Sequence, residues 1–237
     1  VETNVMGTFN VMECARKFKV EHFLLASTSS IYGGNKEMPY SETQKADLQL
    51  TMYSATKKAT ESMTHAYSNL WSIPTTVFRF FTVYGPWGRP DMAFFKFAKK
   101  IIDGDPIDIY NQGAMKRDFT FVTDIVKGIE LLMAKSPIER FVGDDFEEKD
   151  SLSPIAPFRI VNIGNSEPVL LLDFIEELEL AIGKRAIRNY LGMQPGDVDA
   201  TWADVSLLHE LTGFTPDTSL RDGIKEFIDW YRQYYGV

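Results

Sequence analysis

Two short apolar segments on either side of a long helix-forming stretch constrain the fold of this chain most. Residues 22–26 (HFLLA) and 75–81 have the length and composition of buried strands, and residues 50–70 between them are rich in good helix formers. Strand and helix patterns continue to alternate down to a last amphipathic helix that begins at Ser219. Such alternation predicts an α/β protein with a mainly parallel, doubly wound, Rossmann-like sheet.

The chain changes character at residues 85–90 (GPWGRP), which are too rich in Gly and Pro for regular structure. Before this loop the pattern is Rossmann-like, and after it the pattern fits a smaller, mixed α/β lobe. We therefore expect 1–84 to belong to a Rossmann-like domain that later segments complete, and 85–237 to form mainly the second lobe.

Charge and composition narrow the class of ligand. The 237 residues carry a net charge of -8, whereas a nucleic-acid partner requires a basic surface. The one cysteine, Cys14, cannot form an intrachain disulfide, and no Cys/His cluster suggests a metal. No apolar run approaches the ~18 residues of a membrane span. We expect a cytoplasmic protein that binds neither nucleic acid, nor metal, nor membrane.

A Tyr-x-x-x-Lys pattern occurs twice, and its surroundings separate the two matches. Tyr32 and Lys36 flank Gly33–Gly34 and so lie in a loop, whereas Tyr53 and Lys57 share one face of the predicted helix. A phenol is a poor base at neutral pH, but a nearby ammonium favours the phenolate. The second pair therefore suits proton removal from a sugar hydroxyl while hydride leaves for a nicotinamide. The alternative is an ordinary surface pair on an amphipathic helix.

Hydroxyl side chains follow the first predicted strand, where residues 26–30 are Ala-Ser-Thr-Ser-Ser. Ligands of open parallel sheets bind at the carboxyl ends of strands. A hydroxyl of this run can therefore hydrogen-bond an oxygen that is being oxidised. The alternative is a Ser/Thr-rich turn without a ligand.

The motifs LLASTSSIYGG, YSATKKATE, FRFFTVYGPWGRPDM, KRDFTFVTDI and MQPGDVDATWADV occur in one order. Together they resemble the extended short-chain dehydrogenases/reductases that act on nucleotide sugars, most of all UDP-glucuronate 4-epimerases of capsular polysaccharide synthesis. The likeness covers essentially the whole chain. It implies NAD as cofactor, a nucleotide-sugar substrate, an NAD-binding role for 1–84 and a nucleotide-sugar-binding role for most of 85–237.

The resemblance also assigns roles near the cofactor. It implies that Tyr53 is the catalytic base and acid, that Lys57 binds the nicotinamide ribose and tunes this tyrosine, and that Thr28 hydrogen-bonds the sugar 4-oxygen. Ala26 and Phe80, at the ends of the two predicted strands, are implied to lie at the cofactor.

Four further residues are implied to bind substrate. Arg117 resembles the arginine that meets the diphosphate, and Asp197 resembles a ribose-binding acid. Arg89 suits a hexuronate carboxylate, and Thr82 stands where galactose-type epimerases commonly carry Asn. The alternatives are a surface salt bridge to Asp118 for Arg117, a turn residue for Asp197 and a solvated loop arginine for Arg89.

The implied reaction is oxidation at C4 and reduction from the opposite face, which converts UDP-glucuronate to UDP-galacturonate through a 4-keto sugar. Nucleotide-sugar 4,6-dehydratases and decarboxylases are the enzyme alternatives, and they carry Thr-Asp-Glu or Ser-Glu after the strand. Here Thr28 is followed by Ser29 and Ser30. The extra acid is missing, which favours epimerisation.

A non-catalytic alternative also stays open. The sequence contains no Gly-x-x-Gly-x-x-Gly turn to hold a pyrophosphate, and in the family this turn lies upstream of the segment that matches Asn4. We therefore expect the N-terminal Gly-rich βαβ half to be absent from this chain, which would leave a truncated fragment without activity. In relatives, the helix at 50–70 and its neighbour form the four-helix bundle of a dimer, so a homodimer is implied.

Overall fold

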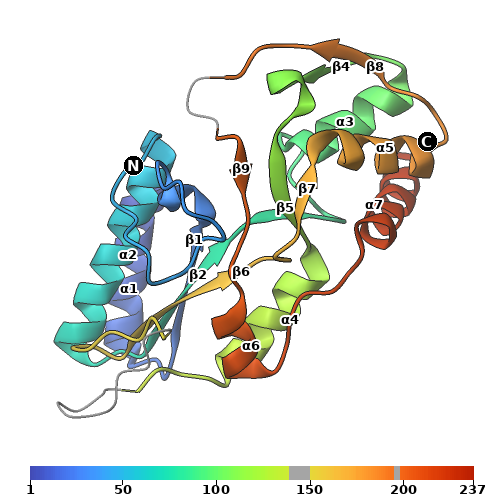
Figure 1. The fold of residues 1–237 in the computed structure, drawn as a ribbon. Helices are drawn as coiled ribbons and strands as arrows, with labels where there is room; N and C mark the ends of the chain where they lie inside the picture. The colour runs from blue at the N-terminus through green and yellow to red at the C-terminus, as the bar shows by residue number, and fades with distance from the viewer. Residues whose placement is uncertain (139–149, 195–197) are drawn as a thin grey trace. The chain divides into compact units, whose positions relative to one another are not determined.

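The structure, a computed structural model, describes residues 1–138, 150–194 and 198–237. The chain divides into two compact units (Figure 1). Unit 1 comprises Val1–Phe81, Lys127–Ile163 and Ala203–Thr215, and unit 2 comprises Thr82–Val126, Gly164–Trp202 and Pro216–Val237. The assignment of NAD to 1–84 and of the nucleotide sugar to most of 85–237 stays a prediction.

A three-stranded parallel sheet in the order β1–β2–β6 forms the framework of unit 1. Its strands are β1 (Phe23–Thr28), β2 (Thr75–Phe80) and β6 (Phe158–Ile163). They are in register, so their last residues Thr28, Phe80 and Ile163 lie side by side. Parallel strands joined by helical connections confirm the predicted Rossmann-like α/β class.

β1 extends further at its carboxyl end than the predicted segment 22–26. Ser27 and Thr28 continue the ladder opposite Arg79 and Phe80, and both hydroxyl side chains are buried. The prediction stopped at the last apolar residue, whereas backbone pairing sets the end of the strand.

Helices α1 (Gly7–Phe18) and α2 (Met52–Trp71) lie side by side in unit 1 (Figure 1). α2, predicted at 50–70, begins after Thr51, which forms a reciprocal capping box with Ser54. The box satisfies backbone N–H groups that the first turn leaves without partners. The other helical segments of unit 1 are η1 (Glu2–Met6), η2 (Ser29–Tyr32) and α6 (Ser206–Thr212).

Unit 2 is built on mixed strand pairing. β5 (Lys116–Phe121) pairs in parallel with β3 (Thr82–Tyr84) and β9 (Ala200–Thr201), and antiparallel with β7 (Pro168–Leu170). A separate parallel pair joins β4 (Pro106–Ile109) and β8 (Ile187–Tyr190). This combination is the mixed character expected of the second lobe.

The helices of unit 2 enclose an aromatic core that includes Tyr84, Phe174 and Phe227. α7 begins at the predicted cap, where the Ser219 side chain accepts a hydrogen bond from Asp222 N. The helical segments are α3 (Ala93–Asp103), η3 (Tyr110–Gly113), α5 (Leu171–Ile182) and α7 (Leu220–Tyr235), while α4 (Val122–Met133) runs from unit 2 into unit 1.

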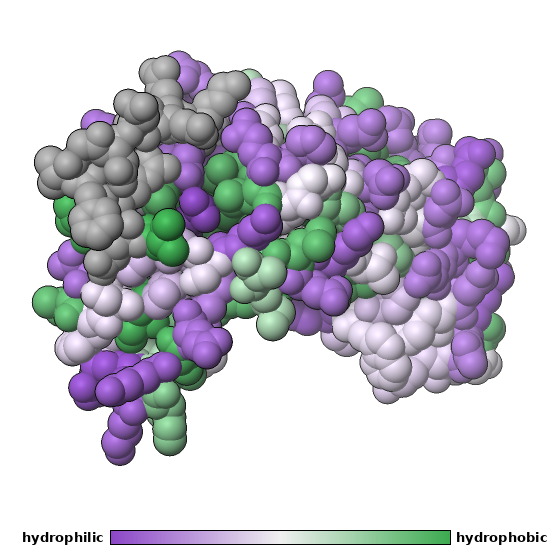
Figure 2. All heavy atoms as spheres, turned by 90° about the horizontal axis from the view of Figure 1, so that it is seen from below, coloured by the Kyte–Doolittle hydropathy of each residue, from purple (hydrophilic) through white to green (hydrophobic). Residues whose placement is uncertain are grey.

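In the described parts of the chain, no helix is long and apolar enough to cross a membrane. On the face drawn in Figure 2, hydrophobic side chains occur in small groups among hydrophilic ones. Hydropathy alone therefore marks no ligand site on that face, and the site has to be built from individual side chains.

Candidate active site

α2 presents the predicted base and its lysine on one helix face. Tyr53, Lys57 and Glu61 are spaced four residues apart on this helix, so they form a row along it. Side-chain exposure falls along the row: Tyr53 is 51% exposed, Lys57 is partly buried and Glu61 is only 3% exposed. The phenol is therefore open to a ligand, while the carboxylate lies in the core.

Lys57 is held against β1, two residues before the strand ends. Its Nζ donates to the carbonyl oxygen of Ala26 at 2.5 Å. Burial lowers the pKa of Lys57, and the Glu61 carboxylate opposes that shift. Because an ammonium has three donors, the bond to Ala26 fixes the charge and still leaves donors for ribose hydroxyls.

Thr28 ends β1 and starts the turn after it. Its Oγ1 accepts a hydrogen bond from Ser30 N at 3.2 Å and so caps η2, and it donates to Ser30 Oγ at 3.2 Å. The hydroxyl run is therefore both a strand end and a Ser/Thr turn. The two interpretations of the sequence do not exclude each other.

In the other Tyr-x-x-x-Lys match, the tyrosine is part of the core of unit 1. Tyr32 is fully buried, stacks on Tyr40 with ring centroids 4.6 Å apart, and donates from its hydroxyl to Asn162 Oδ1 at 2.8 Å. Burial raises the pKa of Tyr32 to about 12. A phenol in this place is unsuited to act as a base, which leaves Tyr53 as the accessible phenol of the two.

The predicted cofactor residues gather at one edge of the sheet in unit 1. Phe80 ends β2 beside Thr28 and is partly exposed. Together with Ala26, Lys57 and Tyr53 they are called the cofactor cluster below. Thr28 and Phe80 end β1 and β2, where parallel sheets bind ligands, and Lys57 is bonded to Ala26. Their role at the nicotinamide ribose of NAD stays a prediction.

Two predicted substrate residues lie in unit 2 near β3. Thr82 opens that strand opposite Phe119 and is partly exposed. Arg89, in the loop after β3, donates from Nε and Nη2 to the two carboxylate oxygens of Asp91 at 3.0 and 2.6 Å. These bonds hold the pKa of Asp91 below its usual value. The Arg89 side chain is 73% exposed, so a guanidinium in carboxylate-binding geometry stands at the surface.

Arg117 lies on β5 and donates to the backbone oxygens of Lys116 at 2.9 Å and Asp199 at 3.4 Å. Its neighbour Asp118 is fully buried and accepts hydrogen bonds from Asn165 N at 2.7 Å and Ser166 N at 3.0 Å. The Asp118 carboxylate is therefore held in the interior of unit 2, and the role of Arg117 at the diphosphate stays a prediction. The predicted ribose ligand Asp197 lies outside the described residues.

An ion pair behind Lys57 is a feature that the sequence pattern does not indicate. Glu61 binds Arg79 of β2 with an Nη2–Oε2 distance of 2.9 Å, and Ser27 Oγ donates to the same carboxylate at 2.6 Å. Both charged side chains are buried. The available signal was the position of Glu61, four residues after Lys57 on the same helix face.

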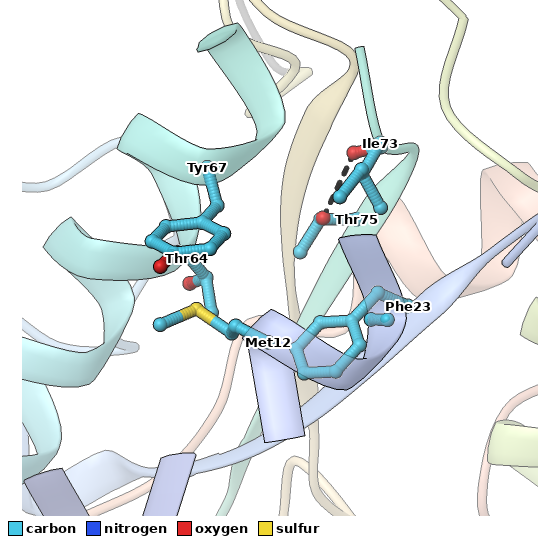
Figure 3. A pocket seen from close by; sticks show the side chains of 7 residues that line it. Met12, Phe23, Thr64, Tyr67, Ile73 and Thr75 are labelled. Carbon is cyan, nitrogen blue, oxygen red and sulfur yellow. Dashed lines mark hydrogen bonds between the residues drawn. The ribbon is translucent and has the colours of Figure 1, made fainter. Parts of the chain in front are cut away.

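A small cavity in unit 1 is separate from these residues. It lies between α1, α2 and the first two strands, and Met12, Phe23 and Tyr67 are among the side chains that line it (Figure 3). Its volume of about 10 Å³ is room for about one water molecule. No predicted site residue lines it, so it is a packing gap.

Among the described residues, no three His, Cys, Asp or Glu side chains are grouped to hold a metal ion.

Comparison with known sequences identifies the family. The profile described as "NAD dependent epimerase/dehydratase family" matches residues 1–142. The chain is 47% identical over 237 residues to "Protein CapI" of Staphylococcus aureus, and 49% identical over 235 residues to a "Probable UDP-glucuronate 4-epimerase" of Rhizobium meliloti. These alignments cover 99% of this chain and 70% and 69% of the two relatives. The chain belongs to the NAD-dependent epimerase/dehydratase family.

A solved structure supports the same conclusion. The UDP-glucuronic acid 4-epimerase of Bacillus cereus, crystallised with UDP-glucuronic acid and NAD, superimposes with a TM-score of 0.84 at 34% sequence identity. The match covers 99% of this chain and 69% of the Bacillus protein. The predicted family and fold class are therefore confirmed.

Proposed function

We propose that this protein catalyses the NAD-dependent 4-epimerisation of a nucleotide sugar, converting UDP-glucuronate to UDP-galacturonate. The observation that carries the proposal is the position of the exposed Tyr53 one helical turn before Lys57, which is hydrogen-bonded to Ala26 of β1. The substrate is suggested by the relative from Rhizobium meliloti, named a probable UDP-glucuronate 4-epimerase, and by the ligands of the Bacillus cereus structure.

The cluster at the strand ends would hold the nicotinamide half of NAD. Lys57 would donate to the ribose hydroxyls with the protons that it does not use on Ala26, and Phe80 would lie beside the ring. Bound NAD would supply hydride acceptance from C4 of the sugar and hydride return.

Tyr53 would move the proton that accompanies each hydride. As the phenolate that the Lys57 ammonium stabilises, it would accept the proton of the sugar 4-hydroxyl while C4 is oxidised, and so become a neutral phenol. Thr28 would hydrogen-bond the 4-oxygen and so orient it. After the 4-keto sugar presents its other face, Tyr53 returns the proton to the 4-oxygen, which completes inversion without net oxidation.

The remaining predicted residues would recognise the substrate. Arg89 would bind the uronate carboxylate through the same two donors that hold Asp91. Arg117 would meet the diphosphate, Thr82 would contact the sugar, and Asp197 would bind the ribose of the nucleotide.

The turn after β1 supports epimerisation over the related eliminations. A 4,6-dehydratase or a decarboxylase needs an additional acid or base after the strand. Ser29 and Ser30 occupy that turn, and the Ser30 hydroxyl is bonded to Thr28. The residues after Thr28 therefore offer no carboxylate for either reaction.

We also propose that the protein is a cytoplasmic homodimer. Exposed hydrophobic side chains on the adjacent helices α1 and α2, among them Val11, Phe18 and Leu70, offer apolar surface for a second copy. Light scattering at micromolar concentration tests this, and a monomeric mass would contradict it.

Product analysis tests the proposed reaction. The intact protein with NAD is incubated with UDP-glucuronate, and the products are separated and identified by proton NMR. An equilibrium mixture with UDP-galacturonate is expected. A UDP-pentose with release of carbon dioxide would instead show a decarboxylase, and unchanged substrate would refute the proposal.

A further inference from the structure

The ion pair between Glu61 and Arg79 joins the helix that carries Tyr53 to two strands at once. The Glu61 carboxylate accepts hydrogen bonds from Arg79 Nε at 3.1 Å and Nη2 at 2.9 Å, and from Ser27 Oγ at 2.6 Å. The Arg79 and Glu61 side chains are only 2% and 3% exposed. Lys58 approaches the same carboxylate at 3.8 Å. One side chain of α2 is thus bound by β1 and by β2.

The partners of Glu61 belong to a polar row that crosses the whole sheet. Ser27, Arg79 and Asn162 are register partners on β1, β2 and β6, one residue before the strand ends. All three are buried. The row therefore lies directly behind the edge at which the cofactor cluster stands.

Two neighbouring residues of β1 hold two successive turns of α2. Ala26 accepts the hydrogen bond from Lys57, and Ser27 donates to Glu61. With Arg79 as a third anchor, the rotation and the depth of the helix are both fixed. A slip by one turn would displace the row of Tyr53, Lys57 and Glu61 by about 5.4 Å.

We propose that Glu61 and Arg79 are positioning residues for epimerisation, which clamp α2 to the sheet so that Lys57 and Tyr53 keep their reactive places. This inference rests on the proposed function. Stability alone does not account for the pair, because apolar side chains of similar volume often replace a buried ion pair without loss of stability. Its place behind Lys57 is what assigns it a role in the site.

The test removes both charges together, in Glu61→Met with Arg79→Met, so that no unpaired charge is left in the core. We expect the variant to fold, kcat to fall roughly 10- to 100-fold and KM to stay within about threefold, because misplaced groups lower the rate more than binding. The kcat–pH profile should differ from that of the wild type, because the Lys57 ammonium is no longer held in its place beside Tyr53. Amide hydrogen exchange at residues 52–61 should be roughly tenfold faster.

The matched control removes the ion pair between a buried carboxylate and a partly exposed arginine of unit 2, in Glu179→Met with Arg188→Met. Glu179 is a buried helix carboxylate bound to Arg188 at 3.1 Å. This variant should keep the kcat, the pH profile and the exchange of residues 52–61. Should Glu61→Met with Arg79→Met not fold, Glu61→Gln, which keeps the side-chain shape, is compared in the same way.

Three outcomes separate the claims. A variant that is less stable but has an unmoved pH profile and unchanged exchange at 52–61 would show a merely structural pair and overturn the inference. Turnover equal to that of the wild type would do the same. If the wild type itself does not epimerise UDP-glucuronate, the proposed function fails, and the hydrogen exchange still decides whether the pair clamps α2.

Discussion

Lys57 on α2 and Ala26 on β1 are joined by a hydrogen bond of 2.5 Å from the ammonium to the carbonyl oxygen. The bond places a positive charge one helical turn from Tyr53, two residues before the end of the strand. The backbone thus fixes the position of the charge, which a lysine side chain in solvent would not keep.

Replacement of this cation should lower the rate most at low pH. In Lys57→Met, we expect kcat at neutral pH to fall by roughly 10²- to 10⁴-fold, because proton transfer by the phenol is no longer assisted. Raising the pH should restore part of the activity. Steady-state kinetics from pH 6 to pH 10 check this, and a loss that is constant over the whole range would contradict the assigned role.

Loss of the phenol should stop the chemistry and leave the fold intact. Tyr53→Phe removes only an exposed hydroxyl, so we expect little change in stability and a drop in kcat of roughly 10²- to 10⁴-fold. Tyr67→Phe is the matched control, because this tyrosine lies on the same helix and donates to Glu13 at 2.6 Å. Full turnover in Tyr53→Phe would refute the mechanism.

Removal of the loop guanidinium should affect only substrates that carry a carboxylate. In Arg89→Met, we expect KM for UDP-glucuronate to rise roughly 10- to 100-fold, the range that corresponds to a lost charged hydrogen bond. Binding of UDP-glucose, which lacks the carboxylate, should not change. Arg185→Met, at an exposed arginine paired with Glu179, serves as the control. Equal losses for both sugars would remove the assigned specificity.

Glu42 should make stability depend on pH. Burial raises its pKa from an ordinary 4.5 to about 7, although Asn162 N donates to it at 2.7 Å. The folded state thus holds this proton more tightly than the unfolded chain, so stability falls as the pH rises through that window. Glu42→Gln should remove this dependence.

Denaturant unfolding at pH 5 and pH 8 measures the effect of Glu42. Between pH 5 and pH 8, the wild type should lose about 1–3 kcal/mol of unfolding free energy that Glu42→Gln does not lose. Glu37→Gln, at an exposed glutamate of the same loop, should show the same pH dependence of the unfolding free energy as the wild type. A parallel pH dependence in wild type and Glu42→Gln would show that Glu42 does not titrate in this range.

The sequence predicted those parts of the site that depend on local spacing. The helical spacing of Tyr53 and Lys57 placed them on one face, and Gly33–Gly34 correctly separated Tyr32 from them. The start of the last helix at Ser219 was also confirmed, because the N-cap bond joins residues only three apart in the chain.

The sequence did not predict the parts of the site that depend on strand register. Ser27 and Arg79 are 52 residues apart and meet only because β1 pairs with β2. Glu61 has a polar side chain, and a pattern of hydrophobic residues assigns such a side chain to the surface. For the same reason, Asp118 was considered a surface partner, whereas its carboxylate is buried on the backbone of residues 165 and 166.

The transfer of the C4 hydrogen tests the central claim most directly. UDP-glucuronate that carries deuterium at C4 is incubated with the intact protein and NAD, and the epimer is analysed by NMR and mass spectrometry. The proposed reaction predicts UDP-galacturonate with deuterium retained at C4, because the same hydride leaves and returns. Loss of the deuterium to solvent, or the absence of the epimer, would contradict it.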